Sequence, residues 1–334
     1  MTSREIIRRV IEHDNPPRIG LDFLAGYPRD ISRVEAPWPS HPDRAAFGAW
    51  GRHPELLAQV GGFSGDVRMT PFGDIYGRLE GKTKGECLKG ALTGGWELLD
   101  SYEFPDIGMP DDARVFNRDM FLLTGFPCAV FSSLRDARLM ANALADTLLE
   151  PNNVLRYLER MVELNLKAIG IAADRGVHGM AMADDLGTQH ATFMSPASFR
   201  ELFIPAYKVL ADAIHARGMK FFLHSCGFVA PLIPDLIDAG VDVFQFDQPE
   251  LAGSDFLAAE YGRSVAFQLP VDIQKIMPTG DKRIITEGAV RMVEAFKKCG
   301  GSLIAMDYCA WHDLQVEPEW QIWAREAIIA NADM

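Results

Sequence analysis

The stretch "MKFFLHSCGFVAPLIPDLIDAG" (residues 219–240) contains a short apolar run, a polar break and an amphipathic segment, in that order. The apolar run ends abruptly in the letters HSCG (224–227), and the segment that follows has a helical pattern up to Gly240. A continuous apolar run is typical of a parallel strand that is buried on both faces. The amphipathic segment is then the helix that returns the chain to the next strand.

The same unit of apolar run and helical segment recurs along the chain. The segment 195–218, for example, has Ser195 as a predicted helix N-cap, Pro196 at the first helical position and Gly218 as a stop. The clearest predicted strands span residues 18–24, 128–133, 179–185, 219–225, 241–247, 264–270 and 302–308. This alternation predicts a parallel α/β fold.

Within that class the sequence favours a (β/α)8 barrel. A doubly wound sheet is the alternative, but no G-x-G-x-x-G follows the first strand, and no phosphate-binding G-x-x-x-x-G-K-[ST] is present. Residues 36–112 are richer in Pro, Gly and Trp and break the alternation. We expect one barrel domain over residues 1–334, with 36–112 as an N-terminal elaboration that contains a hairpin near residues 69–81.

Composition excludes several classes of protein. The net charge of −13 argues against a broad nucleic-acid surface, which needs clustered Lys and Arg. No apolar run reaches the about 18 residues of a membrane span, and the charged N-terminus has no signal core, so we expect a cytoplasmic protein. The five cysteines are odd in number and widely spaced, which does not indicate a disulfide framework.

Polar side chains end most of the predicted strands. A (β/α)8 barrel places its chemistry at the carboxyl ends of its strands, so these side chains are expected to share one rim. A single Asp at a strand end is as often a helix cap or a turn residue, and only the convergence points to a site. The predicted catalytic residues are Asp184, Asp185 and Asp247, and the predicted substrate-binding residues are Asp22, Gln189, His190, Gln245 and Gln268.

His224 and Cys226 are the best metal ligands that the sequence offers. At positions i and i+2 of a strand end they point the same way, and a thiolate beside an imidazole suits Zn²⁺. Alone, the pair is more often a packed His beside a small apolar Cys. A third ligand is needed, and Cys309 is our choice, with His312 as the competitor. A nucleophilic triad with Asp247 ranks lower, because His224 and Cys226 point alike rather than at each other.

The segment "FFLHSCGFVAPLIPDLIDAGVDVFQFDQP" (221–249) resembles the core motif of the uroporphyrinogen decarboxylase superfamily, and more narrowly the branch of cobamide-dependent methyltransferases. The segments "DDLGTQHATFMSPASFRELFIPAYKVLADAIHARGMK", "GGWELLDSYEFPD" and "HDLQVEPEW" support the resemblance. It implies a (β/α)8 barrel with Zn²⁺ held by His224, Cys226 and a residue at the last strand end.

The resemblance also implies a reaction and a partner. A methyl group would move between a small-molecule donor or a thiol and a corrinoid, with Zn²⁺ as Lewis acid. The chain lacks a D-x-H-x-x-G corrinoid motif, so the corrinoid would be carried by a separate protein.

Two other functions stay open. The first is a metal-free decarboxylase of a smaller substrate that uses Asp184 or Asp22. True uroporphyrinogen decarboxylases carry an R-Q-A-G-R-Y stretch for substrate carboxylates, and here the region reads "LDFLAGYPRDI", with Arg29 nearby. The second is a non-catalytic barrel kept as a binding module, which the preserved polar rim disfavours.

Overall fold

A nearly closed barrel of parallel strands forms the core of the protein. The computed structural model describes residues 1–24, 26–79, 83–108, 116–310, 314 and 316–334. Around the barrel the strands follow the order β1 (Gly20–Asp22), β13 (Leu303–Met306), β12 (Ala266–Leu269), β11 (Val243–Gln245), β10 (Lys220–His224), β9 (Gly179–Ala183), β8 (Phe121–Gly125) and β2 (Ile31–Arg33). All of the hydrogen-bonded pairs in this sheet are parallel, which confirms the predicted (β/α)8 fold.

Helices connect the strands from β8 onward. They are α4 (Phe131–Arg138), α5 (Met140–Leu149), α6 (Pro151–Asp174), α7 (Pro196–Leu202), α8 (Ile204–His215), α9 (Ile233–Ala239), α10 (Ser254–Tyr261), α11 (Lys282–Lys297) and α12 (Pro318–Ala330), with short 3-10 turns η2 (Ala230–Leu232), η3 (Pro249–Leu251) and η4 (Met277–Thr279). Ser195 caps α7 as predicted, and Gly240 ends α9 in a left-handed conformation. None of the described helices combines the length and the apolar composition that crossing a membrane requires.

The barrel has one plugged end and one open end. Helix α1 (Ser3–Glu12) packs Ile7 and Val10 against the inward-facing side chains of Phe121 and Phe222. Phe121 and Phe222 lie in the part of the barrel interior that is away from the carboxyl ends of the strands. Helix α1 therefore closes the amino-terminal end of the barrel. The carboxyl ends of the strands, where the polar residues gather, form the open mouth.

The seam between β1 and β2 is closed by side chains and a loop rather than by a helix. Asp30 forms an ion pair with Arg18 and accepts the backbone N–H of Leu21, and an isolated bridge joins Asp22 to Arg29. The loop is thereby held tightly at the barrel wall, which brings Asp22 to the mouth.

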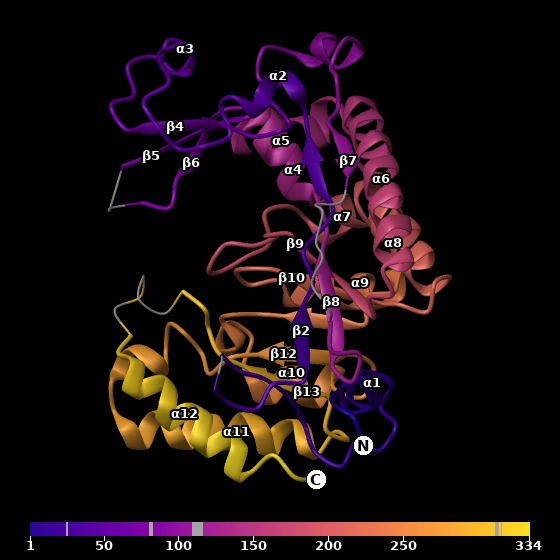
Figure 1. Ribbon diagram of the computed structural model, residues 1–334, viewed down its shortest axis with the longest axis vertical. Helices are drawn as coiled ribbons and strands as arrows, with labels where there is room; N and C mark the ends of the chain where they lie inside the picture. The colour runs from indigo at the N-terminus through magenta and orange to yellow at the C-terminus, as the bar shows by residue number, and fades with distance from the viewer. Residues whose placement is uncertain (25, 80–82, 109–115, 311–313, 315) are drawn as a thin grey trace.

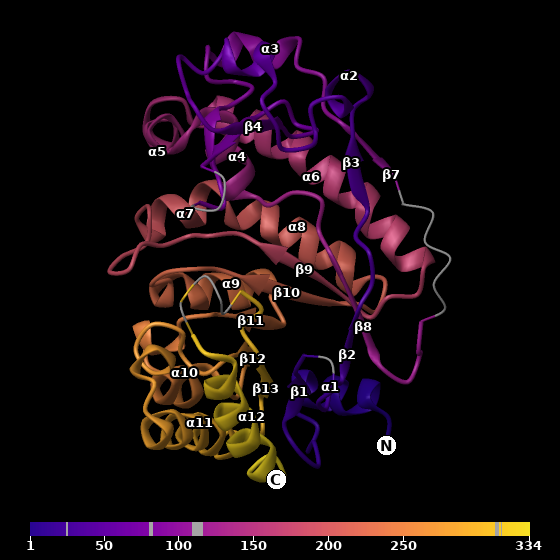
Figure 2. The same ribbon diagram turned by 60° about the vertical axis from the view of Figure 1, so that its left-hand side comes forward.

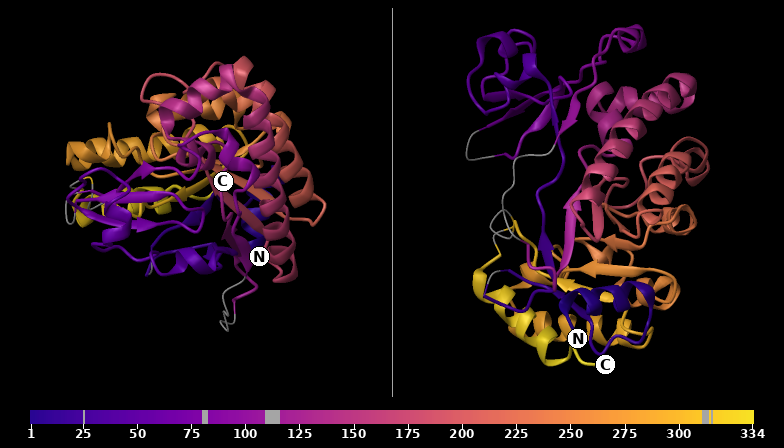
Figure 3. Two further views of the ribbon diagram at one scale, coloured as in Figure 1. Left: turned by 90° about the horizontal axis from the view of Figure 1, so that it is seen from above. Right: turned by 45° about the vertical axis from the view of Figure 1, so that its right-hand side comes forward.

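An elaboration lies between β2 and β8. It contains a two-stranded sheet of β3 (Trp38–Ser40) and β7 (Asp106–Gly108), a three-stranded sheet of β4 (Asp66–Met69), β5 (Ile75–Arg78) and β6 (Glu86–Lys89), and the short helices α2 (Pro42–Ala45), α3 (Pro54–Leu57) and η1 (Trp96–Asp100). The β4–β5 pair is the predicted hairpin. Figures 1 and 2 show the elaboration on the opposite side of the barrel from both chain ends, and the left view of Figure 3 shows it from above. The assignment of residues 1–334 to a single domain stays a prediction.

One strand was predicted in the wrong place, and another was missed. Residues 128–133 are not a strand, because α4 begins at Phe131 and the true strand β8 ends at Gly125. The helix start there depends on a carboxylate from another part of the chain, Asp184, which accepts its first backbone N–H groups. Strand β2 was missed because it has three residues, of which Ile31 alone is fully buried.

Candidate metal centre

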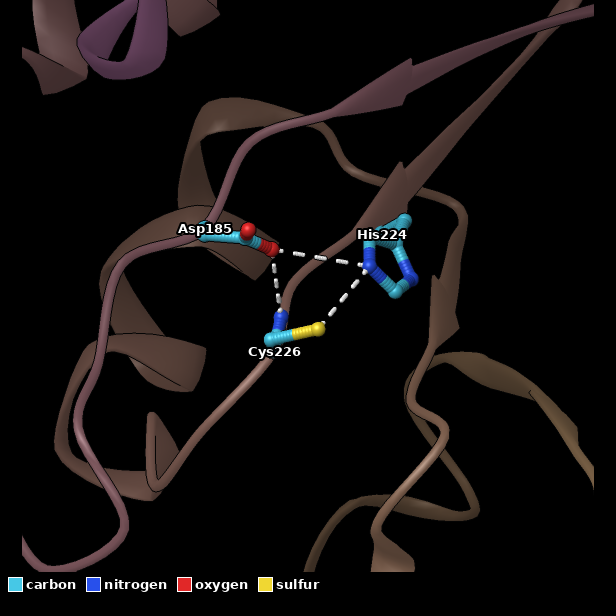
Figure 4. Close-up of side chains that lie close together, drawn as sticks. All are labelled: Asp185, His224 and Cys226. Atoms are coloured by element: carbon cyan, nitrogen blue, oxygen red, sulfur yellow. Dashed lines mark hydrogen bonds and ion pairs between the residues drawn. The ribbon is translucent and has the colours of Figure 1, made fainter. Parts of the chain in front are cut away.

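Three side chains with metal-binding atoms meet at the carboxyl ends of β9 and β10. His224 pairs with Ala183 in register, so the residues that follow the two strands lie side by side. Nε2 of His224 lies 3.4 Å from the sulfur of Cys226 and 3.5 Å from Oδ1 of Asp185. One donor atom from each of the three residues lies within 4.8 Å of the other two, and Figure 4 shows them converging on one point.

The backbone around Gly227 brings the thiol into this group. The N–H of Cys226 donates to Oδ1 of Asp185 at 2.9 Å, which fixes the turn after β10. Gly227 then adopts a φ of 83°, and a Cβ there would lie 2.2 Å from the carbonyl oxygen of Gly187. Only glycine fits both the left-handed backbone and the close approach. The turn therefore holds Cys226 beside His224 instead of letting the strand continue.

The charges of the group favour a cation. The hydrogen bond from His224 lowers the pKa of Asp185 to about 2. Burial opposes charging of the imidazole, but hydrogen bonds to Asp185 and Cys226 raise the pKa of His224 to about 11. In the absence of metal, a proton on Nε2 is thus stabilised between a carboxylate and a thiol. A divalent ion would use the same three donors in place of that proton, so the residues fit Zn²⁺.

Gln245 and Asp247 orient the imidazole. Nδ1 of His224 donates to the amide oxygen of Gln245, and the amide nitrogen of Gln245 donates to Oδ1 of Asp247 at 2.8 Å. Because the carboxylate of Asp247 can only accept a hydrogen bond, the NH₂ group of Gln245 must face it, and the amide oxygen must then face His224. The imidazole binds this oxygen through Nδ1, so its Nε2 faces Asp185 and Cys226. Metal-binding histidines are commonly fixed in this way through their second nitrogen. The geometry favours this positioning role, while the catalytic role of Asp247 and the substrate-binding role of Gln245 stay predictions.

We expect the variant Gln245→Leu to bind zinc about 10- to 100-fold more weakly than the wild type, because the imidazole loses its orienting acceptor. The measurement is a competition titration with a chromophoric chelator. Gln268→Leu is the matched control, since Gln268 is the register partner of Gln245 on β12 but donates to Asp22 instead of contacting His224. Equal zinc affinity in Gln245→Leu and the wild type would show that the amide does not position the ligand.

Asp184 is buried beside the site but does not face it. Its side chain has no exposed surface, and burial raises its pKa. Its oxygens accept the backbone N–H groups of Val130, Phe131 and Ser132 at 2.7 to 3.0 Å and the hydroxyl of Tyr207 at 2.6 Å. These contacts cap α4 and occupy the carboxylate. The geometry therefore supports a structural role for Asp184 and gives no support to its predicted catalytic role.

Asp22 and Gln268 lie together at the mouth of the barrel. The amide of Gln268 and the guanidinium of Arg33 each donate to Oδ2 of Asp22 at 2.8 Å. Sequence reasoning missed Arg33 because it did not recognise β2. Once that strand is known, Arg33 ends it in the way that His224 ends β10.

The remaining predicted residues stand apart from the three-residue group. Gln189 and His190 are exposed in the turn between Gly187 and Thr192, and His312 lies outside the described residues. Cys309 is exposed on the loop after β13 and does not belong to the group within 4.8 Å. Burial raises the pKa of the neighbouring Tyr308, and the charges of Asp247, Cys309 and Cys226 act in the same direction. Cys309 follows the carboxyl end of β13 by three residues, and its role as a ligand stays a prediction.

A family model and one solved structure with a similar fold agree with the architecture. The family model "Uroporphyrinogen decarboxylase (URO-D)" matches residues 120–311. The fold is similar to that of a methyltransferase from Methanosarcina mazei, with a TM-score of 0.64, 13% identity and coverage of 99% of this chain and 98% of that chain. A chitinase from Chromobacterium violaceum gives a TM-score of 0.39 at 12% identity, over 93% of this chain and 99% of that chain. No curated protein matches. Since the family model spans more than half of the sequence, from β8 to the end of β13 and beyond, the chain belongs to the uroporphyrinogen decarboxylase family.

Proposed function

We propose that this protein is a zinc-dependent methyltransferase that moves a methyl group between a small molecule and a corrinoid on a separate protein. The observation that carries the proposal is the convergence of Asp185, His224 and Cys226 at the barrel mouth. A thiolate, an imidazole and a carboxylate form a donor set that suits zinc, and a metal-free decarboxylation would not need it. The similar fold of a protein described as a methyltransferase supports the same reading.

The residues at the site would have separate roles in binding the metal and in orienting its ligand. Bound Zn²⁺ would supply Lewis acidity to the heteroatom that gives up or accepts the methyl group. Asp185, His224 and Cys226 would hold it, and Gln245 keeps the imidazole in the productive orientation. With three protein ligands, the ion would still be accessible to the substrate, as is usual for catalytic zinc. Cys309, the third ligand predicted from the sequence, stays the alternative to Asp185 in this set.

A methyl-transfer assay with cob(I)alamin tests the proposal. The donors are methoxylated aromatic compounds, methylamines, methyl thioethers and betaines, and the absorbance change of the corrinoid reports transfer. We expect activity with at least one donor class from zinc-loaded protein, loss of activity after chelation, and recovery when zinc is restored. Transfer that is unchanged by complete zinc removal would contradict the proposed metal centre.

A metal-free decarboxylase is the second function that one observation favours. Asp22 is a buried carboxylate at the mouth, held by Arg33 and Gln268, and the family takes its name from a decarboxylase. This function predicts release of CO₂ from small carboxylic acids that persists in chelated protein and in Cys226→Ser. Loss of all activity in both preparations excludes it.

A further inference from the structure

Two cavities lie on either side of His224. The inner chamber has a volume of about 230 Å³ at the barrel mouth, above a floor of Leu123, Ala181 and Phe222. The outer cleft has a volume of about 340 Å³ and lies between the elaboration and α4. Among the described residues that line these two spaces, His224 alone lines both. The imidazole is therefore part of the partition between them.

The inner chamber is a dead end with an apolar floor. Helix α1 blocks the barrel below Phe222, and the small residues Gly125 and Ala181 on β8 and β9 leave room above it. The side chains of Val34 and Met306 extend the apolar lining, and the amides of Gln245 and Gln268 are polar groups in the same lining. Such a chamber fits a small molecule with an apolar body.

Positive charge lies across the chamber from His224. Arg33, which is 52% exposed, lines the chamber from β2, and β8 and β9 stand between β2 and β10 in the sheet. Its guanidinium donates to buried Asp22, and Arg29 also lies within electrostatic range of that carboxylate. Asp30 acts on the same carboxylate but is itself paired with Arg18, so the two guanidinium groups around Asp22 still leave this side with a net positive charge, which suits an anionic end group.

The outer cleft has a different chemistry. Its walls carry Thr70 and Asp74 from the elaboration and Ser132, Ser133 and Arg135 from α4, and it ends at Asp185 and His224. These are hydrogen-bonding groups around an opening to solvent. A corrin ring bears amide groups on its periphery and is far too large for the chamber inside the strands. The cleft offers both the access and the partners that such a ring needs.

We propose that the small-molecule reactant, with an apolar body and an anionic end, occupies the inner chamber, and that the corrinoid reaches the methyl group through the outer cleft. This inference rests on the proposed function. Methyl transfer breaks the bond between carbon and heteroatom, with the electron pair left on the heteroatom, and forms the new bond with the acceptor's own pair. The donor heteroatom and the acceptor must lie on opposite sides of the methyl carbon. Two cavities that meet at His224 allow this arrangement.

Steady-state kinetics of two filled-cavity variants test the assignment. Ala181→Leu fills the inner chamber, and we expect it to raise KM for the small molecule at least about 10-fold with KM for cob(I)alamin unchanged. Ser133→Trp fills the outer cleft and is expected to do the reverse. The smaller changes Ala181→Val and Ser133→Leu replace either variant that fails to fold or to retain zinc. A reversed pattern, or equal effects of each variant on both KM values, would overturn the assignment.

Binding measurements give the same distinction without turnover. In cobalt-substituted protein, the thiolate absorption band should report tighter binding of mercaptoacetate than of ethanethiol, and Arg33→Gln should abolish the preference. Equilibrium dialysis of hydroxocobalamin should show binding that Ser133→Trp weakens and Ala181→Leu leaves intact. A wild type that shows no preference for the anionic thiol, or that does not bind cobalamin, contradicts the inference. If both ligands bind as expected but no methyl group is transferred, the proposed function fails and the cavity assignment stands.

Discussion

Cys226→Ala is expected to purify with almost no zinc, whereas the wild type carries about one ion per chain. Cys226 supplies the only sulfur in the group formed with Asp185 and His224 among the described residues. Loss of an orienting partner alone costs metal affinity about 10- to 100-fold, so loss of a ligand should cost at least about 100-fold. The measurement is elemental analysis after dialysis against a weak chelator. Methyl transfer should fall with the zinc content.

The other cysteines provide the controls for this experiment. Cys128 is buried and contacts Asn165, and Cys299 contacts the carbonyl of Ala258, so alanine at either position should leave the zinc content unchanged. Cys309→Ala decides between the two candidates for the third ligand. Retention of zinc favours Asp185, and loss of zinc assigns Cys309 to the site. Full zinc content in Cys226→Ala would refute the metal centre.

Asp184→Ala should destabilise the fold strongly. The substitution removes the acceptor of three backbone N–H groups at the start of α4 and of the Tyr207 hydroxyl, all of them close to a carboxylate with no exposed surface. Each buried donor left without a partner costs about 1–3 kcal/mol, and the total is expected to reach about 3–5 kcal/mol. Urea denaturation followed by circular dichroism measures the free energy of unfolding.

Tyr207→Phe is the matched control for Asp184→Ala. It removes one of the hydrogen bonds and keeps the buried carboxylate, so its expected cost is only about 1 kcal/mol. The same pair of variants separates the structural role of Asp184 from the catalytic role that its position in the sequence suggested. An Asp184→Ala protein with wild-type stability and zinc content but no activity would restore the catalytic role.

The barrel could be predicted because its later strands are continuous apolar runs. From β9 to β13, the predicted runs contain the observed strands, and their polar ends reach the mouth. His224 and Cys226 were found for the same reason, since residues two apart at a strand end share a side. Strand β2 gave no such signal, and with it Arg33 and the charged wall of the inner chamber were missed.

The choice between Asp184 and Asp185 could not be made from the sequence. The two carboxylates are adjacent at the end of β9, but one accepts N–H groups from α4 and the other faces His224. That division depends on where α4 begins, and "CAVFSS" reads locally as a strand. A helix start that is fixed by a distant acid is a tertiary effect. Local patterns do not contain it.

X-ray absorption at the zinc edge tests the central claim most directly. For the purified wild type we predict a first shell with at least one sulfur at about 2.3 Å and nitrogen or oxygen atoms at about 2.0–2.2 Å. The outer-shell scattering should show an imidazole ring, and His224→Ala should lose it together with most of the zinc. A protein that binds no zinc, or a zinc shell without sulfur, would contradict a metal centre built from Asp185, His224 and Cys226.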